Sequence, residues 1–117
     1  MSDKIYEFLD KIRPVSTGHA MGEKQVFLSA ADSISNITQF AYGTFKPGEG
    51  SGMHTHSTME EFFYFLNGYG KCRAGKEHIN IYPDMFLRIL PNTDHSIENT
   101  GELDLTFIYF GAAVEKI

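Results

Sequence analysis

Short apolar segments, separated by Gly, Pro, Asn and Asp, follow one another along the chain from residue 25 onward. Runs of this length and composition predict strands, and the breaks between them predict turns. Many short strands at close spacing, without the crossover helices of a parallel sheet, are typical of an antiparallel sandwich or a small barrel. The pattern therefore predicts an all-β fold with strands at Gln25–Ser29, Ile37–Phe45, Glu61–Asn67, Lys71–Ala74, Glu77–Ile81, Phe86–Leu90, His95–Asn99 and Leu103–Phe110.

The N-terminal segment follows a different period. Asp3 is a candidate N-cap, Pro14 follows the segment, and between them apolar residues recur at helical spacing at Ile5, Phe8, Leu9 and Ile12. This pattern predicts a short helix within residues 1–14. We expect its apolar stripe to pack on the barrel or on a second subunit.

Alternation within the strands predicts which side chains share a face, because successive residues of a strand point to opposite sides. In the last strand the odd-numbered residues are apolar or aromatic, so the side chains expected inside are Leu103, Leu105, Phe107 and Tyr109. The strand Glu61–Asn67 is apolar on both faces, which is typical of a strand that is covered on both sides. Alternation from Glu61 sends Phe63 and Phe65 inward.

Length and charge narrow the class of protein. The chain has 117 residues and a formal net charge of −5, from 10 Lys and Arg against 15 Asp and Glu. This length suits one domain, residues 1–117, and the acidic balance argues against a nucleic acid or an anionic membrane as partner. No run approaches the roughly 18 apolar residues of a spanning helix. Because Cys72 is the single cysteine, no intrachain disulfide is possible, and we expect a cytoplasmic protein.

The candidate chemistry lies in the segment His54-Thr55-His56. If this segment is extended, both imidazoles lie on one face with Cα atoms about 6.6 Å apart, and both can reach one ion. Such a pair alone is more often a surface or packing feature than a metal site. Glu61 follows after a short connection and adds a carboxylate, and His95 is a fourth candidate that a barrel can bring to the same interior point.

At these residues the sequence resembles the cupin superfamily. The first cupin signature, G-x5-H-x-H-x(3,4)-E-x6-G, is matched at every fixed position by Gly48, His54, His56, Glu61 and Gly68. The spacing to Gly68 selects Glu61 over its neighbour Glu60, which alternation turns the other way.

The second cupin signature, G-x5-P-x-G-x2-H-x3-N, is matched in part. His95 and Asn99 keep their spacing, whereas the positions of the first glycine, the proline and the second glycine hold Asp84, Leu90 and Asn92. Asp and Asn adopt left-handed backbone more readily than other non-glycine residues, so the two turns are expected to persist.

The resemblance spans roughly residues 37–110 and implies a fold and a cofactor. The implied fold is a double-stranded β-helix, a jelly-roll barrel with its core at about residues 25–112. The implied cofactor is one divalent transition metal (Zn, Fe, Ni, Mn or Cu), and the ligands map to His54, His56, Glu61 and His95. Small cupins commonly dimerise, so a homodimer is expected.

Other residues have competing interpretations. Phe63 and Tyr109 are candidates for contact with a small-molecule ligand, and Tyr109 is the only polar inward group that we nominate as catalytic, but core packing is the more common role for both. Arg88 is expected to face outward, and Cys72 to be a small buried hydrophobe. His19 and His78 are expected to be structural or solvated.

An ion held by three imidazoles and one carboxylate keeps open coordination positions, which favours function over a purely structural role. The leading hypothesis is metal-assisted isomerisation or epimerisation of a sugar or carbonyl compound, which needs a general base near the ion. The first alternative is an Fe(II) dioxygenase whose substrate chelates the ion. The second is a module that binds a small ligand through the metal without turnover.

Overall fold

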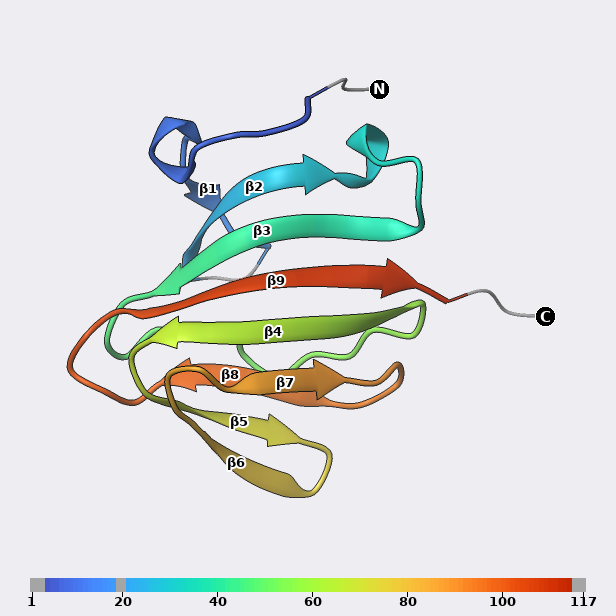
Figure 1. The fold of residues 1–117 in the computed structure, drawn as a ribbon. Coiled ribbons are helices and arrows are strands. Elements are labelled where there is room, and N and C mark those ends of the chain that lie inside the picture. Colours follow the sequence, from blue (N-terminus) through green and yellow to red (C-terminus); the bar gives the residue numbers. More distant parts are fainter. Residues whose placement is uncertain (1–3, 19–20, 115–117) are drawn as a thin grey trace.

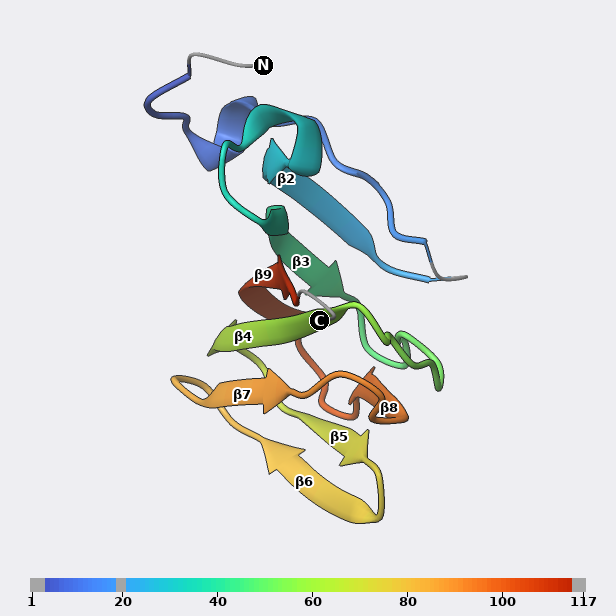
Figure 2. The ribbon, with the colours of Figure 1, turned by 90° about the vertical axis from the view of Figure 1, so that its right-hand side faces the viewer.

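Two antiparallel sheets face each other in the computed structural model, which describes residues 4–18 and 21–114 (Figures 1 and 2). The larger sheet has six strands in the order β1-β2-β3-β9-β4-β7, and the smaller has three in the order β6-β5-β8. The bounds of the strands are β1 Val15–Ser16, β2 Glu23–Ser29, β3 Ile37–Phe45, β4 Met59–Asn67, β5 Gly70–Ala74, β6 Glu77–Ile81, β7 Phe86–Ile89, β8 His95–Asn99 and β9 Leu105–Ala113. The all-β jelly-roll prediction is confirmed.

The prediction of an N-terminal helix is wrong. Within residues 4–14 the structure has only a 3-10 turn, η1 (Leu9–Lys11), while Asp3 lies outside the described residues. The apolar stripe is not buried, since Ile5 is 94% exposed and Phe8 63% exposed. A helix this short is unstable in water without a packed face. Instead, the Gln25 amide donates to the backbone carbonyls of Leu9 (2.9 Å) and Ile12 (3.0 Å) and ties the turn to β2.

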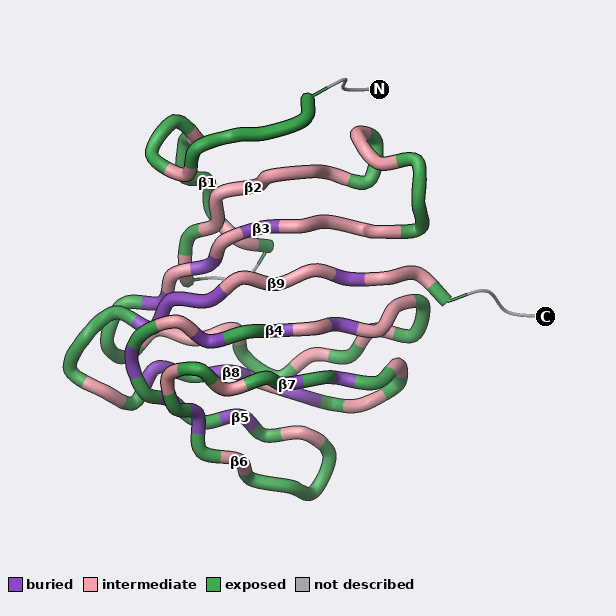
Figure 3. The backbone as a smooth tube through the Cα atoms, viewed as in Figure 1, coloured by how far each residue is buried: buried purple, intermediate pink, exposed green. Residues whose placement is uncertain are grey.

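The core fills the space between the two sheets, and Figure 3 marks buried positions along strands of both sheets. Its members are Phe45, Phe63, Phe65, Cys72, Ile81, Leu87, Ile89, Ile97, Leu105 and Phe107. The inward predictions for Phe63, Phe65, Leu105 and Phe107 are confirmed, and the buried Cys72 is confirmed as well. Leu103 is the exception, at 71% exposed. Leu103 precedes β9 and lies in a turn, where its own backbone carbonyl accepts a hydrogen bond from the Asn99 side chain (2.8 Å). Strand alternation therefore does not apply to Leu103.

Two turns adopt left-handed backbone without glycine. The φ angle is 68° at Asp84 and 64° at Asn92, and no other described non-glycine residue has a positive φ. Short polar side chains lower the steric cost of this region, as expected for these two positions. Each turn is fixed by a backbone hydrogen bond of 2.7 Å, from Asp84 N to the carbonyl of Phe65 and from Asn92 N to the carbonyl of His56.

Candidate metal centre

The first two histidines are positioned by an irregular segment that runs antiparallel to β8. The backbone N–H of Ser51 donates to the carbonyl of Ile97 (2.8 Å), and His54 and His95 exchange two backbone hydrogen bonds of 2.9 Å each. His54 and His95 therefore lie directly opposite each other on neighbouring chains. His56 follows two residues later, where its carbonyl accepts the hydrogen bond from the left-handed turn residue Asn92.

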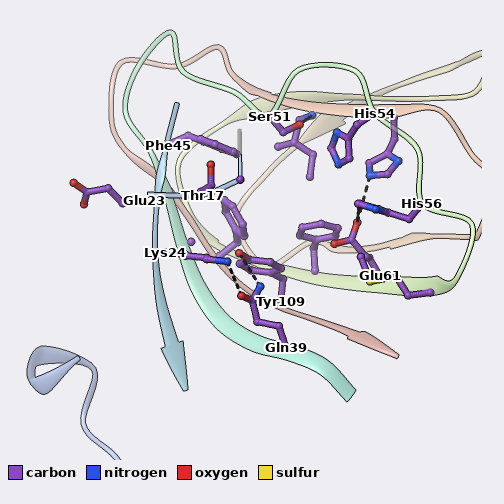
Figure 4. Close-up of a pocket in the computed structure, with 17 residues that line it drawn as sticks. Thr17, Glu23, Lys24, Gln39, Phe45, Ser51, His54, His56, Glu61 and Tyr109 are labelled. Atoms are coloured by element: carbon purple, nitrogen blue, oxygen red, sulfur yellow. Dashed lines mark hydrogen bonds and ion pairs between the residues drawn. The ribbon is translucent and has the colours of Figure 1, made fainter. Parts of the chain in front are cut away.

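The other two residues of the cluster come from opposite sheets. Glu61 is on β4 of the six-stranded sheet and is 9% exposed, while His95 begins β8 of the three-stranded sheet and is 1% exposed. Their side chains meet, since His95 Nε2 is 3.3 Å from Glu61 Oε1, and Figure 4 shows the side chains of His54 and His56 above Glu61. The structure thus brings together all four residues that the sequence nominated as metal ligands.

The four side chains have the spacing of a metal centre. One donor atom from each residue lies within 4.8 Å of the other three. Glu61 Oε1 is 3.4 Å from His56 Nε2 and 3.3 Å from His95 Nε2. Bonds of about 2.1 Å to a common ion place neighbouring ligand atoms about 3.0–3.4 Å apart, between octahedral and tetrahedral angles. The two separations from Glu61 Oε1 therefore fit ligand atoms of one ion.

Backbone carbonyls set the tautomer of two of the imidazoles. The Nδ1 atom of His54 lies 3.0 Å from the carbonyl oxygen of Gly52, and that of His95 lies 2.8 Å from the carbonyl oxygen of Thr93. A carbonyl only accepts, so Nδ1 carries the proton in both rings. The neutral rings then direct the lone pair of Nε2 toward the cluster, the arrangement in which an outer partner orients a metal-binding histidine.

Two buried atoms of the cluster lack hydrogen-bond partners among residues 4–18 and 21–114: Glu61 Oε1 and His95 Nε2. Both are acceptors when the carboxylate is charged and the ring is neutral, so each needs a proton or a cation nearby. Burial by itself lowers the pKa of His95, but the interaction with the Glu61 carboxylate and the hydrogen bond to the Thr93 carbonyl outweigh it, and the net pKa is raised. A cation between these atoms would satisfy both of them.

The cluster opens into a cavity of about 190 Å³. By the same measure, roughly 10–15 Å³ holds a single water molecule, so a small metabolite fits. Phe63 and Tyr109, the two predicted contact residues, both line the cavity, and their rings stack with centroids 5.6 Å apart and planes 10° apart. This geometry suits both roles considered for them, core packing and a wall for a ligand.

Two further residues of the cavity were not found from the sequence. Lys24 and Gln39 extend from β2 and β3 beside Tyr109 (Figure 4), and Lys24 Nζ donates to Gln39 Oε1 (2.7 Å). In the sequence, Lys24 and Gln39 belong to no recognised motif, so nothing marked them as functional. Strand alternation could place them on a face of a strand, but the pairing of β2, β3 and β9 is what aligns them with Tyr109.

The other candidates that the structure describes lie away from the cavity. His78 is exposed on β6, and His19 lies outside the described residues. Arg88 is exposed as expected, and its guanidinium is 3.5 Å from the carboxylate of Glu60, which points away from the cluster side of β4. Cys72 is buried in the core, and burial raises the pKa of its thiol to about 11.

The comparisons with known proteins agree with this geometry. Residues 41–111 match the family model described as "Cupin domain". An oxalate-binding protein of Thermotoga maritima is 28% identical over 99 residues, 85% of this chain and 82% of that protein. The crystal structure of a predicted oxalate decarboxylase of Thermotoga maritima has a TM-score of 0.88 at 25% identity, covering 94% of this chain and all of that one.

A second relative matches a smaller part of the chain. An uncharacterised protein of Methanocaldococcus jannaschii is 34% identical over 56 residues, and the match spans 48% of this chain and 45% of that protein. Separately, none of the helical turns in residues 4–18 and 21–114 is long and apolar enough to cross a membrane.

Proposed function

The chain belongs to the cupin family, and from that premise we propose that its cavity binds one divalent transition-metal ion and uses it to hold a small carboxylate ligand. The proposed metal ligands are His54, His56, Glu61 and His95. The observation that carries the proposal is the pair of buried, unpartnered acceptors on Glu61 and His95, which converge from opposite sheets. Three imidazoles and a carboxylate are a donor set accepted by Zn, Fe, Ni, Mn and Cu, so availability decides the ion.

Oxalate is the first ligand to test. The name of the Thermotoga maritima relative attributes oxalate binding to that protein. A divalent ion held by a single carboxylate leaves a net positive site, which attracts an anion although the whole chain carries −5. An ion with open positions supplies coordination to ligand oxygens. The protein supplies a walled cavity, in which Phe63, Ile97 and Phe107 exclude water around the ligand.

Metal analysis and calorimetry with oxalate test the proposal. The protein, purified without added metal and then loaded, is expected to hold one ion per chain and to bind oxalate. His56→Gln is expected to lose both properties, while the matched control His78→Gln, on exposed β6, keeps both. Full metal content in His56→Gln, or no oxalate binding by the loaded wild-type protein, would overturn the proposal.

The isomerase hypothesis lacks a base in this cavity. Among the described residues that line it, the one carboxylate outside the cluster is Glu23, which is exposed at the rim. Burial raises the pKa of Tyr109 to about 12, which makes it a hydrogen-bond donor at neutral pH and unsuited to accept a proton from carbon. Tyr109 as a catalytic residue would thus act as an acid.

The base-poor cavity favours a second candidate, the Fe(II) dioxygenase, because a substrate that binds the ion directly needs no separate base. Oxygen uptake by the Fe(II)-loaded protein, coupled to loss of a candidate substrate, tests this activity. Ligand binding without oxygen uptake or product would favour the third hypothesis, a module that binds its ligand without turnover.

The proposed location is the cytoplasm. This proposal rests on the single cysteine, the buried Cys72, which excludes an intrachain disulfide.

We also propose a homodimer formed through the outer face of the six-stranded sheet. Five phenylalanines on adjacent strands form a continuous aromatic stripe across this face, with centroid distances of 4.8–6.5 Å between neighbours; they are Phe27, Phe40, Phe110, Phe62 and Phe86. Phe86 is 62% exposed. The strands that carry the stripe have seven (β2), nine (β3, β9 and β4) and four (β7) residues, so at about 3.3 Å per residue and about 4.8 Å between strands the face measures roughly 600 Å². A stable dimer buries roughly 600–1,000 Å² per partner, so a second copy fits this face.

Light scattering after gel filtration tests the dimer. Wild-type protein is expected at twice the chain mass of 13.2 kDa, and Phe62→Glu at the single-chain mass. Tyr69→Glu, at an exposed tyrosine between β4 and β5, is the control and is expected to remain dimeric. A monomeric wild-type protein, or a dimeric Phe62→Glu, would contradict this interface.

A further inference from the structure

A chain of three polar side chains lies on the side of the cavity away from the histidines (Figure 4). Lys24 on β2 donates to Gln39 Oε1 on β3 at 2.7 Å, and Gln39 Nε2 donates to the Tyr109 hydroxyl on β9 at 3.3 Å. All three residues line the cavity. We call this arrangement the Lys24–Gln39–Tyr109 relay.

The hydrogen bonds of the relay can run in only one direction, from Lys24 to Gln39 and from Gln39 to Tyr109. Lys24 can only donate, so the oxygen of the Gln39 amide must face it and the NH₂ group must face Tyr109. The Tyr109 hydroxyl therefore accepts from Gln39, and its own proton points elsewhere. Burial raises the pKa of Tyr109 to about 12, so the phenol keeps this proton at neutral pH. No hydrogen bond among the described residues uses the proton, and the residue lines the cavity.

The relay also brings positive charge to the cavity. Lys24 is the one cationic side chain among the described residues that line it, and its ammonium has two further N–H donors besides the one given to Gln39. The neighbouring Glu23 also lines the cavity, but its carboxylate points away from Lys24 in Figure 4. The apolar rings of Phe63 and Phe107 also line the cavity, with centroids 5.6 and 5.4 Å from that of Tyr109, and they offer no hydrogen bonds to a carboxylate.

We propose that the relay is a second anchor, which binds a carboxylate at the end of the ligand remote from the metal. This inference rests on the proposed function and narrows it to dicarboxylates. One carboxylate of the ligand lies at the cluster and the other accepts hydrogen bonds from Tyr109 and Lys24. Gln39 is a positioning residue, since it holds the phenol and the ammonium in register without contacting the ligand.

The test compares ligands with one and two carboxylates. Affinities of the metal-loaded protein are measured by calorimetry for acetate and for oxalate, malonate and succinate. A hydrogen bond to a charged group contributes about 1.5–3 kcal/mol. Tyr109→Phe and Lys24→Met are therefore each expected to weaken the best dicarboxylate about tenfold or more. Acetate affinity and metal content are expected to stay within twofold. Gln39→Leu is expected to weaken the same dicarboxylate, and Lys71→Met, on the exposed side of β5, to change nothing.

The outcomes separate this inference from the proposed function. Unchanged dicarboxylate affinity in Tyr109→Phe and Lys24→Met, or an equal loss for acetate, would overturn the relay as a second anchor. So would a wild-type protein that binds no dicarboxylate. Metal content and acetate binding of the wild-type protein report on the metal site alone, so that site can stand while the relay fails.

Discussion

Glu61→Gln tests whether the arrangement of the cluster favours cation binding and lowers the stability of the metal-free protein. In the metal-free protein, Glu61 Oε1 and His95 Nε2 are buried 3.3 Å apart, and neither has a hydrogen-bond partner. The Thr93 carbonyl holds the proton of His95 on Nδ1, so with a neutral ring two acceptors face each other. A glutamine amide would place an N–H donor between them.

The expected gain follows from the cost of an unsatisfied buried polar atom, about 1–3 kcal/mol. Metal-free Glu61→Gln is therefore expected to be more stable than the metal-free wild-type protein by about 1–3 kcal/mol. Metal affinity is expected to fall by at least ~100-fold, because removing even an outer partner of a ligand costs about 10–100-fold. The free energy of unfolding is measured by urea denaturation in a chelator at alkaline pH, which favours the neutral form of the His95 ring, whose pKa is raised.

Glu60→Gln is the matched control for this experiment. Glu60 is the neighbouring carboxylate on β4, and it faces the partly exposed Arg88 at 3.5 Å instead of the cluster. Exposed ion pairs contribute about 0–1 kcal/mol, so stability is expected to change little and metal affinity not at all. A metal-free Glu61→Gln that is less stable than wild-type protein, or that keeps wild-type metal affinity, would refute the account of the cluster.

Three further predictions concern the scaffold. Asn99→Ala is expected to cost about 2–4 kcal/mol in urea denaturation. The Asn99 amide donates to the carbonyls of Phe45 and Leu103 and accepts from the N–H of Gly101. A fully orphaned group costs about 1–3 kcal/mol, but only the bond to Phe45 is fully buried, so water recovers part of the loss at the other two. A loss below about 1 kcal/mol would contradict this. Phe65→Ala is expected to cost about 3–5 kcal/mol by the same assay, since the ring is fully buried. The Cys72 thiol, with a pKa of about 11, is expected to resist alkylation in the folded protein at pH 8 and to react after denaturation, and rapid labelling of the folded protein would refute its burial.

The strands could be predicted from the sequence because side-chain alternation depends on local order. The cluster could be predicted because its four residues match the cupin signatures, although His95 reaches Glu61 only through the packing of two sheets. Alternation of side chains is fixed by backbone geometry, so Phe63 and Phe65 could be placed inside before any contact was known. The spacing of His54, His56 and Glu61 lies within one strand-loop-strand stretch, and the left-handed turns at Asp84 and Asn92 follow from short polar side chains.

What failed or was missed depended on tertiary contacts. The N-terminal pattern had a helical period, yet a short helix needs a packed face, and the described part of the chain leaves the apolar residues Ile5 and Phe8 exposed. The Lys24–Gln39–Tyr109 relay joins residues of three strands whose neighbours in the sheet are distant in sequence, and its hydrogen bonds exist only once β2, β3 and β9 are paired. Local geometry thus determined the faces of the strands, and the match to the cupin signatures identified the metal-site residues, whereas the pairing of distant strands, which no local propensity encodes, decided what lies across the cavity from them.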